Sequence, residues 1–373
     1  MKLIIEPNEG VAPIVAAIKN ARKSVEIAIF RFEYGGIEAA LKAAVVKGVK
    51  VTALIANTNR GGVKHLRELE MRFLAAGMVV ARTGDDLLRY HDKFIIIDRN
   101  TLYMLSFNLT RLDIDRSRGF GIVTKNTKLV QEAVKLFEAD CTRCAYRPKL
   151  DAFVVSPTNA RKVLGRFLKR AKKQLLIFDP KISDKEMIRV LQDRAKAGVE
   201  IRIIGRIDEG AHLSISKPPN IRLHTRTIIR DRHLAFVGSQ SLRPAELDSR
   251  REVGLIVHEA KVVKGLIDTF ESDWTSKDAA ENPATLEDKE IPREEPLTAP
   301  KIKEEKVAEL LVKELYPLTT TVKKAVKKVV ARVGEDILED KKVKDTVKKV
   351  VKRAVREAVK EAVQDSPEPK NRI

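Results

Sequence analysis

Short apolar runs alternate along the chain with segments whose apolar residues recur three or four positions apart. Val25 to Phe30 is a strand-like apolar run, Ile37 to Lys47 has helical spacing, and Val49 to Ala56 is again strand-like. Strands that alternate with helices of about 12 residues are typical of βαβ units. The pattern therefore predicts an α/β fold with a largely parallel or mixed sheet covered by helices.

The same pattern occurs twice. The segment from Met1 to about residue 143 recurs from about residue 151 to residue 276, and only the first copy has an additional helix-like stretch, Val63 to Ala76. A fixed internal period indicates repeated structural units. We therefore predict two fused βαβ-rich half-domains, residues 1–148 and 149–276, packed about a pseudo-twofold axis that brings equivalent positions face to face. Equivalent landmarks are 150 positions apart before the additional stretch and 133 apart after it: Pro7 and Pro157, Ala21 and Ala171, Gly48 and Gly198, then His91 and His224, Asp98 and Asp231, Ser106 and Ser239.

The composition changes after residue 276. Residues 277–306 are rich in Pro, Glu and Lys, which predicts a charged linker. In residues 307–373 apolar residues return at helical spacing with lysines between them, which predicts a basic amphipathic helical tail. Three roles are open for this tail: docking on the body or self-association with a second subunit, binding to an anionic membrane surface, and contact with nucleic acid.

Polar side chains converge at one predicted hairpin. His91 and Lys93 are two positions apart before the apolar run of residues 94–97, and Ser106 and Asn108 are two positions apart on the returning strand. Alternate residues of a strand point to the same face. An imidazole, an ammonium, a hydroxyl and an amide are therefore expected on one patch.

The second copy carries a variant of this motif, in which arginine replaces the lysine and serine replaces the asparagine. The pattern H-x-K-x4-D followed by S-x-N resembles the signature of the phospholipase D superfamily. The residues that carry the resemblance are His91, Lys93, Asp98, Ser106 and Asn108 in the first copy and His224, Arg226, Asp231, Ser239 and Ser241 in the second.

The resemblance covers residues 1–276 and implies a phosphodiesterase or phosphatidyltransferase that uses neither metal nor cofactor. In that family two histidines face each other. One attacks phosphorus to form a covalent phosphohistidine, and the other protonates the leaving oxygen and then activates water or an alcohol. Imidazole suits both roles because it is the side chain most easily poised between acid and base near neutral pH. We expect His91 and His224 as this pair, with the phosphate oxygens bound by Lys93, Asn108, Arg226, Ser241, Ser106 and Ser239.

A carboxylate eleven residues past the S-x-N often orients a histidine in this family. Glu252 holds that position in the second copy and is expected to serve His224, whereas the first copy has Gly119 there. His91 would then use another acceptor or a backbone carbonyl. We still favour His91 as the nucleophile because its half keeps the lysine and the asparagine, and the reverse assignment stays open.

Asp98 and Asp231 belong to the family motif, yet each begins a polar turn. Two interpretations are open: they support the hairpin, or they touch the substrate. We expect them to support the residues that contact the phosphate without contacting it themselves.

The chain is strongly basic, with a formal net charge of +20 and a pI near 9.8. This charge attracts polyanions such as nucleic acid, an anionic lipid surface or a phosphorylated substrate. We find no secretory leader pattern and no apolar run of about 18 residues, which predicts a cytoplasmic protein whose membrane contact, if any, is peripheral to the inner surface. Three activities compete: phosphatidyl chemistry, which predicts an apolar rim beside the histidines; an endonuclease, which predicts a basic groove; and a catalytically lapsed polyanion-binding module.

Overall fold

The structure is a computed structural model that describes residues 1–58, 62–208, 213–216 and 221–275, all of which belong to one compact unit. The predicted linker at 277–306 and the predicted helical tail at 307–373 lie outside the described residues. Within the described part, no helix is long and apolar enough to cross a membrane.

The first half is built on a mixed sheet, as the alternation of strands and helices predicted. Its strand order is β1-β8-β7-β6-β2-β3-β4. Strand β2 pairs in parallel with β3 and antiparallel with β6, and β6 and β7 form the predicted hairpin. The strands are β1 (Lys2–Glu6), β2 (Ser24–Ile29), β3 (Lys50–Ile55), β4 (Val79–Arg82), β6 (Phe94–Ile97), β7 (Thr101–Leu105) and β8 (Ser117–Thr124).

The second half repeats this arrangement. Its strand order is β12-β11-β10-β14-β15-β16, and β9 pairs antiparallel with β16 as β1 pairs with β8. The parallel pair β10 and β11 and the hairpin of β14 and β15 correspond to their first-half counterparts. The strands are β9 (Phe153–Ser156), β10 (Gln174–Ile182), β11 (Glu200–Ile207), β12 (Ser214–Ser216), β14 (Arg226–Arg230), β15 (Leu234–Gly238) and β16 (Arg250–Val257).

The helices follow the same repeat, with one exception. Helix α3 lies at the additional stretch predicted for the first copy, and the described residues between β11 and β14 of the second half contain no helix. The first half has α1 (Ala12–Lys19), α2 (Gly35–Val46), α3 (Gly62–Ala75), α4 (Arg111–Asp115) and α5 (Thr127–Thr142), and the second has α6 (Ala160–Lys169), α7 (Lys185–Lys196), α8 (Pro244–Asp248) and α9 (Ala260–Thr275).

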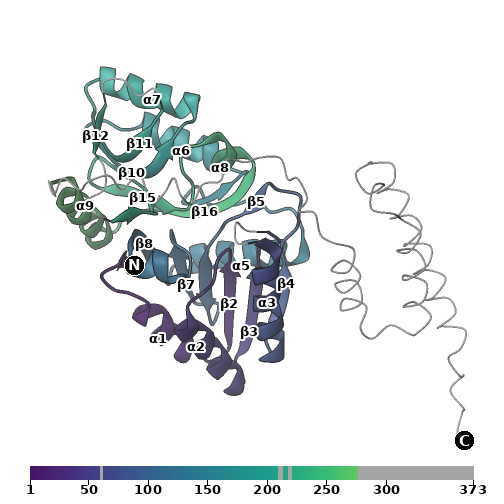
Figure 1. The fold of residues 1–373 in the computed structure, drawn as a ribbon. Helices are drawn as coiled ribbons and strands as arrows, with labels where there is room; N and C mark the ends of the chain where they lie inside the picture. The colour runs from purple at the N-terminus through teal and green to yellow at the C-terminus, as the bar shows by residue number, and fades with distance from the viewer. Residues whose placement is uncertain (59–61, 209–212, 217–220, 276–373) are drawn as a thin grey trace, which may run out of the picture. The chain divides into compact units, whose positions relative to one another are not determined.

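Two short strands cross from one half to the other. Strand β5 (Arg89–Tyr90) belongs to the first half but pairs in parallel with β16, and β13 (Arg222–Leu223) belongs to the second half but pairs in parallel with β8. Figure 1 shows β5 beside β16 where the two halves meet. The two crossing strands are equivalent positions of the repeat, as the predicted pseudo-twofold axis requires.

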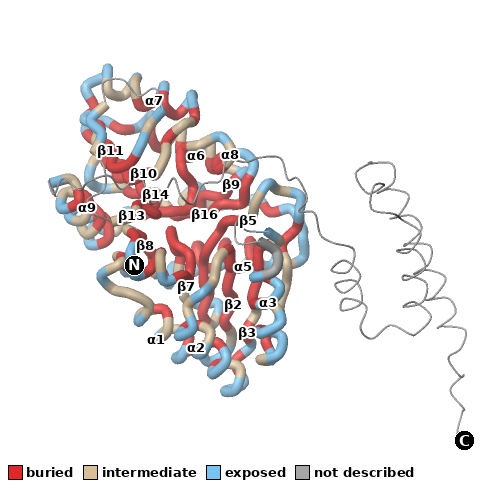
Figure 2. The backbone as a smooth tube through the Cα atoms, in the orientation of Figure 1, coloured by how far each residue is buried: buried red, intermediate tan, exposed pale blue. Residues whose placement is uncertain are grey.

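The core is divided into an outer layer for each half and one layer that the halves share. The outer face of the first sheet packs on α1, α2 and α3, and that of the second packs on α6 and α7. The shared layer contains α5, α9 and the inner faces of both sheets, and Phe120 and Phe178 meet there with ring centroids 5.5 Å apart. Because both faces of each sheet are covered, the strands read as continuous apolar runs. Figure 2 shows this burial along the strands and where the halves meet.

Candidate active site

The crossing strands deliver both histidines to the interface between the halves. Directly after β5, the His91 N–H donates to the Arg251 carbonyl over 2.8 Å, and directly after β13 the His224 N–H donates to the Arg118 carbonyl over 3.1 Å. Each histidine is therefore anchored to a strand of the opposite half, His91 to β16 and His224 to β8. The two anchoring carbonyls are themselves equivalent positions of the repeat.

The prediction that His91 and Lys93 lie within a strand is wrong in detail. Strand β6 begins at Phe94, after Lys93, and β7 ends at Leu105, before Ser106 and Asn108. The physical reason is the crossing: the backbone before β6 forms its hydrogen bonds with β16 of the other half, so the motif spans the junction between two sheets. The motif residues nevertheless lie at one end of the hairpin, as expected.

A cation accompanies each histidine in the same geometry. The Lys93 ammonium donates to the carbonyl of His91 over 2.5 Å, and the Arg226 guanidinium donates to the carbonyl of His224 over 2.5 Å. Arg226 also donates to the Ser241 hydroxyl over 3.2 Å. Burial lowers the pKa of both histidines, and both cations lower it further, which places all four groups within one electrostatic site. Burial lowers the pKa of Lys93 itself to about 7.

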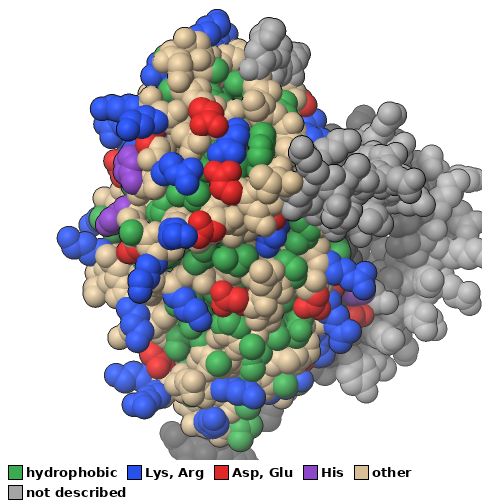
Figure 3. Space-filling model, turned by 90° about the vertical axis from the view of Figure 1, so that its left-hand side faces the viewer, with side chains coloured by type: hydrophobic (Ala, Val, Ile, Leu, Met, Phe, Trp, Pro, Cys, Tyr) green, Lys and Arg blue, Asp and Glu red, His purple; other side chains and the backbone are tan. Residues whose placement is uncertain are grey.

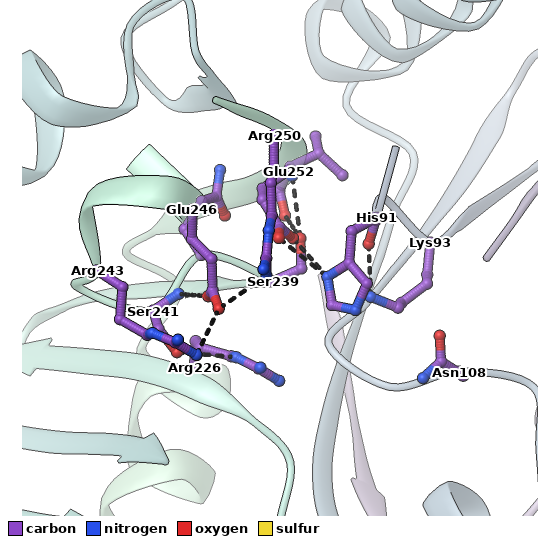
Figure 4. Close-up of polar contacts among 12 residues, drawn as sticks. His91, Lys93, Asn108, Arg226, Ser239, Ser241, Arg243, Glu246, Arg250 and Glu252 are labelled. Atoms are coloured by element: carbon purple, nitrogen blue, oxygen red, sulfur yellow. Dashed lines mark hydrogen bonds and ion pairs between the residues drawn. The ribbon is translucent and has the colours of Figure 1, made fainter. Parts of the chain in front are cut away.

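Glu252 orients His91, so the expected pairing of Glu252 with His224 is wrong. Both carboxylate oxygens lie within hydrogen-bonding distance of His91 Nδ1, at 2.8 and 3.0 Å (Figure 4). The pairing of β5 with β16 places Glu252 of the second half beside the histidine of the first. Burial lowers the pKa of His91 well below its usual range and raises the pKa of Glu252 to about 7. A neutral His91 can donate from Nδ1 to Glu252 and keep the Nε2 lone pair available.

His224 is the histidine without this partner. Gly119 stands where Glu252 stands in the other half, and a Cβ at Gly119 would lie 2.8 Å from Cδ1 of the buried Phe107. The His224 Nδ1 atom is buried and has no hydrogen-bond partner among the described residues. Its Nε2 atom lies 3.6 Å from an oxygen of Asp113. The two histidines are thus chemically distinct.

Two carboxylates that the sequence interpretation did not single out bind the last residues of the S-x-N and S-x-S motifs. Asp113 in α4 accepts from the Asn108 backbone N–H over 3.0 Å and from the Asn108 amide over 2.6 Å. Glu246 in α8 accepts from the Ser241 backbone N–H over 2.7 Å. The two positions are 133 apart, so the repeat offset was the pattern that could have identified them.

Ser106 and Ser239 are fully buried and bond the strands beside the site. The Ser106 hydroxyl accepts from the Phe120 N–H over 2.9 Å, and the Ser239 hydroxyl accepts from the Val253 N–H over 3.1 Å. Ser239 additionally hydrogen-bonds the Glu252 carboxylate. The Ser106 hydroxyl therefore bonds β8, and the Ser239 hydroxyl bonds β16 and the Glu252 carboxylate.

Asp98 and Asp231 support the hairpins from the far end. Asp98 accepts from the backbone N–H groups of Arg22, Lys23 and Ser24 at the start of β2. Asp231 does the same for the three residues that lead into β10, which are Lys172, Lys173 and Gln174. Each aspartate follows its strand, whereas the histidine precedes it, so of the two interpretations the geometry favours support of the hairpin.

Metal-type ligands are not grouped in the described part of the chain. No set of three or more His, Cys, Asp or Glu side chains is arranged there to hold a metal ion. The charged groups around the histidines are instead a lysine and arginines, drawn together in Figure 4 with Glu246 and Glu252.

Two copies of one α/β half, with histidine motifs exchanged across their interface, define a member of the phospholipase D superfamily. The chain belongs to the family described as cardiolipin synthase, PLD-like domain, whose model matches residues 14–141 and 164–274. The match covers both halves and leaves the region after residue 274 outside it. No curated protein sequence matches the chain.

Solved structures share this fold at low sequence identity. Polyphosphate kinase from Porphyromonas gingivalis is 18% identical with a TM-score of 0.62, and the match covers 72% of this chain and 46% of the kinase. The chain thus spans about half the length of that kinase. Phosphatidylserine synthase from Haemophilus influenzae Rd KW20 is 10% identical with a TM-score of 0.57, and the match covers 74% of this chain and 86% of the synthase. At these identities the likeness concerns the fold.

Proposed function

We propose that the protein is a phosphodiesterase of the phospholipase D type that hydrolyses or transfers a phosphatidyl or other phosphodiester group, with His91 as the nucleophile. The observation that carries the proposal is the buried hydrogen bond between His91 Nδ1 and Glu252 across the interface. A carboxylate on one ring nitrogen fixes the tautomer and orients the other nitrogen for attack. Lys93 and Asn108 stand in the same half as His91, which further supports this assignment.

The reaction would proceed in two displacements at phosphorus. His91 Nε2 attacks, the bond to the leaving oxygen breaks, and His224 donates a proton to that oxygen. His224 then accepts a proton from water or an alcohol, whose oxygen attacks phosphorus and releases His91. Each displacement forms one bond and breaks one bond, and the proton that His224 gives in the first is recovered in the second.

The cations of the site would stabilise the negative charge on the nonbridging oxygens. Lys93 and Arg226 lie on either side of the interface (Figure 4), each in contact with its own histidine's backbone. Fixed donors in a buried site stabilise developing charge more strongly than donors in water. Arg226 offers two donor nitrogens to a phosphate, so its replacement of lysine is compatible with phosphate binding.

The test is turnover of bis(4-nitrophenyl) phosphate in the presence of EDTA by the wild type, His91→Ala and His224→Ala. The wild type should be active and both variants should lose activity. Nitrophenolate leaves without a proton, so His224→Ala should still accumulate an adduct that His91→Ala cannot form. Intact-mass measurement after rapid quenching would detect it, and an N-phosphoryl bond is stable to base and labile to acid.

The outcomes separate the alternatives. An adduct in His91→Ala but not in His224→Ala would reverse the assignment of the nucleophile. An inactive wild type, or variants as active as the wild type, would refute the catalytic proposal and favour a polyanion-binding module.

Nucleic acid is a second candidate substrate because additional arginines lie near the two histidines. Arg222 acts electrostatically on His224, and Arg250 acts on His91 and Glu252. A site with more cations than one phosphate requires is suited to a polyanion. Lys and Arg side chains are also spread over both halves on the face drawn in Figure 3.

A comparison of the two substrate classes would decide between the two candidate functions. Hydrolysis of single-stranded DNA and of anionic phospholipid vesicles should be compared in EDTA at two salt concentrations. A nuclease would cleave DNA with a rate that falls steeply with salt. Release of a lipid headgroup by the wild type but not by His91→Ala, with intact DNA, would instead support phosphatidyl chemistry.

A further inference from the structure

Asp113 is a buried carboxylate held at the centre of the site by both halves. Its two oxygens are distributed between partners: one accepts from the Asn108 amide over 2.6 Å, and the other accepts from the Arg222 guanidinium over 2.6 Å. Its backbone N–H donates to the Thr110 hydroxyl, the N-cap of α4, over 3.2 Å. Asp113 is only 3% exposed, so these contacts fix its position.

The Asp113 oxygen that binds Asn108 also faces His224. It lies 3.6 Å from His224 Nε2, the ring nitrogen opposite the unpartnered Nδ1. Although burial opposes ionisation, His224 and Arg222 hold the pKa of Asp113 well below its usual range. Asp113 is therefore a negative charge throughout the working pH range.

The equivalent carboxylate in the other half is arranged differently. Glu246 accepts from the Ser241 N–H over 2.7 Å and pairs with Arg250 and Arg243 at 3.3 and 3.4 Å. Among the described contacts, Glu246 forms no ion pair with His91, whose carboxylate partner is Glu252. His91 thus has its carboxylate at Nδ1, and His224 has its carboxylate at Nε2.

We propose that Asp113 is the positioning residue that favours the protonated form of His224, the general acid, in place of the carboxylate that is absent at Gly119. The inference rests on the proposed function, because it assigns the protonation of the leaving oxygen to His224. A negative charge near an imidazole favours the imidazolium form. The Nε2–H that would be donated lies on the side of Asp113 and of Asn108, where the phosphate would bind. Asp113 carries charge and holds Asn108, and it exchanges no proton itself.

Four charged groups act on His224, and they oppose one another. Burial lowers the pKa of His224 well below its usual range, and Arg226 of β14, Arg222 of β13 and Lys93 of the other half lower it further. Asp113 of α4 raises it. A bound phosphodiester would add a second negative charge beside Asp113, which further favours the imidazolium. Removal of Asp113 should therefore shift the alkaline limb of the kcat–pH profile to lower pH.

The decisive experiment compares leaving groups that differ in their need for a proton. Bis(4-nitrophenyl) phosphate releases a stable nitrophenolate, whereas glycerophosphocholine must release an alkoxide that requires protonation. In Asp113→Asn, we expect kcat to fall about 10- to 100-fold on the alkyl diester and less than about threefold on the aryl diester. The alkaline limb should move down by about one pH unit. The matched control Glu246→Gln removes the equivalent carboxylate from the His91 side, and it should lower both rates alike.

A second variant keeps the test decisive if Asp113→Asn does not fold. Arg222→Gln removes a partly exposed cation that lowers the pKa of His224, so it should move the alkaline limb to higher pH. Equal losses on both diesters with an unmoved pH limb in Asp113→Asn, or a downward shift in Arg222→Gln, would overturn the inference. Activity of the wild type and its loss in His91→Ala are measured in parallel. Should those two fail, the proposed function itself falls, whereas the other outcomes affect only the role of Asp113.

Discussion

The two halves of the molecule share one scaffold and differ in the carboxylates around their histidines. Each half sends a short strand to the other, anchors its histidine to an equivalent carbonyl and places a cation on the histidine's own backbone carbonyl. The side that receives His91 supplies Glu252, and the side that receives His224 supplies Gly119. The repeat thus provides the symmetric geometry, and a few substitutions make the two histidines chemically different.

This difference matches the two roles that a double displacement requires. A nucleophile needs a free lone pair on one nitrogen and a held proton on the other, which the contact between Glu252 and His91 provides. A general acid instead needs its protonated, positively charged form to be stabilised. A carboxylate near either nitrogen of the imidazole ring can provide this.

Removal of the Glu252 carboxylate should give the largest effect, because it would make His91 resemble His224. In Glu252→Gln, the amide can present its N–H to Nδ1 and favour the wrong tautomer. We expect kcat on bis(4-nitrophenyl) phosphate to fall at least about 100-fold, with a smaller change in KM. In the wild type, the acid limb of the profile should lie near the pKa of about 7 of Glu252 and disappear in the variant. The control is Asp151→Asn, an exposed carboxylate of the same half.

A wild-type rate in Glu252→Gln would show that the contact with His91 is structural only. Circular dichroism melting of both variants would separate a loss of catalysis from a loss of folding. An equal melting temperature with a 100-fold lower kcat is the expected combination.

Gly119 stands at the position equivalent to Glu252, and the side chain of Phe107 packs against it. A side chain added at Gly119 should therefore destabilise the protein. In Gly119→Ala, the new Cβ would lie 2.8 Å from Cδ1 and 3.1 Å from Cβ of Phe107, which is fully buried. Overpacking of this kind costs about 1–3 kcal/mol of unfolding free energy, measurable by urea denaturation. The control Gly165→Ala places a Cβ at an ordinary 3.6 Å from Met187 Cε within α6, where alanine should stabilise by about 0.5–1 kcal/mol. Equal stability of both variants would contradict the tight contact with Phe107.

The repeat, the α/β class, the additional α3 and the meeting of the two histidine motifs at the interface were predictable because they depend on local patterns and fixed offsets. The exchange of strands was not predictable, because β5 and β16 are far apart in the chain and their pairing produces no periodic pattern in the sequence. For that reason the spacing rule identified Glu252 but assigned it to the wrong histidine. Asp113 and Glu246 lie in short helices without a recognised motif, and only their matching offset distinguished them.

Asp92 offers the smallest and most selective test of the difference between the halves. Its equivalent, Thr225, shares a hydrogen bond with Thr227 over 2.9 Å, whereas one oxygen of the buried Asp92 has no hydrogen-bond partner among the described residues. Burial raises the pKa of Asp92 to about 6, and the nearby Arg251, which pairs with Asp140, only partly compensates.

A raised carboxyl pKa means that the unfolded chain releases this proton at lower pH than the folded chain. Asp92 therefore costs stability progressively as pH rises from about 4 to about 6, and the full cost remains above that range. Asp92→Asn should raise the unfolding free energy by on the order of 2 kcal/mol at pH 8 and by well under 1 kcal/mol at pH 4. Thermal unfolding of wild type and variant at both pH values measures the difference. The exposed Asp151→Asn controls for the loss of a charge. A gain that is equal at both pH values would refute the assignment, because the cost of burying Asp92 depends on its ionisation.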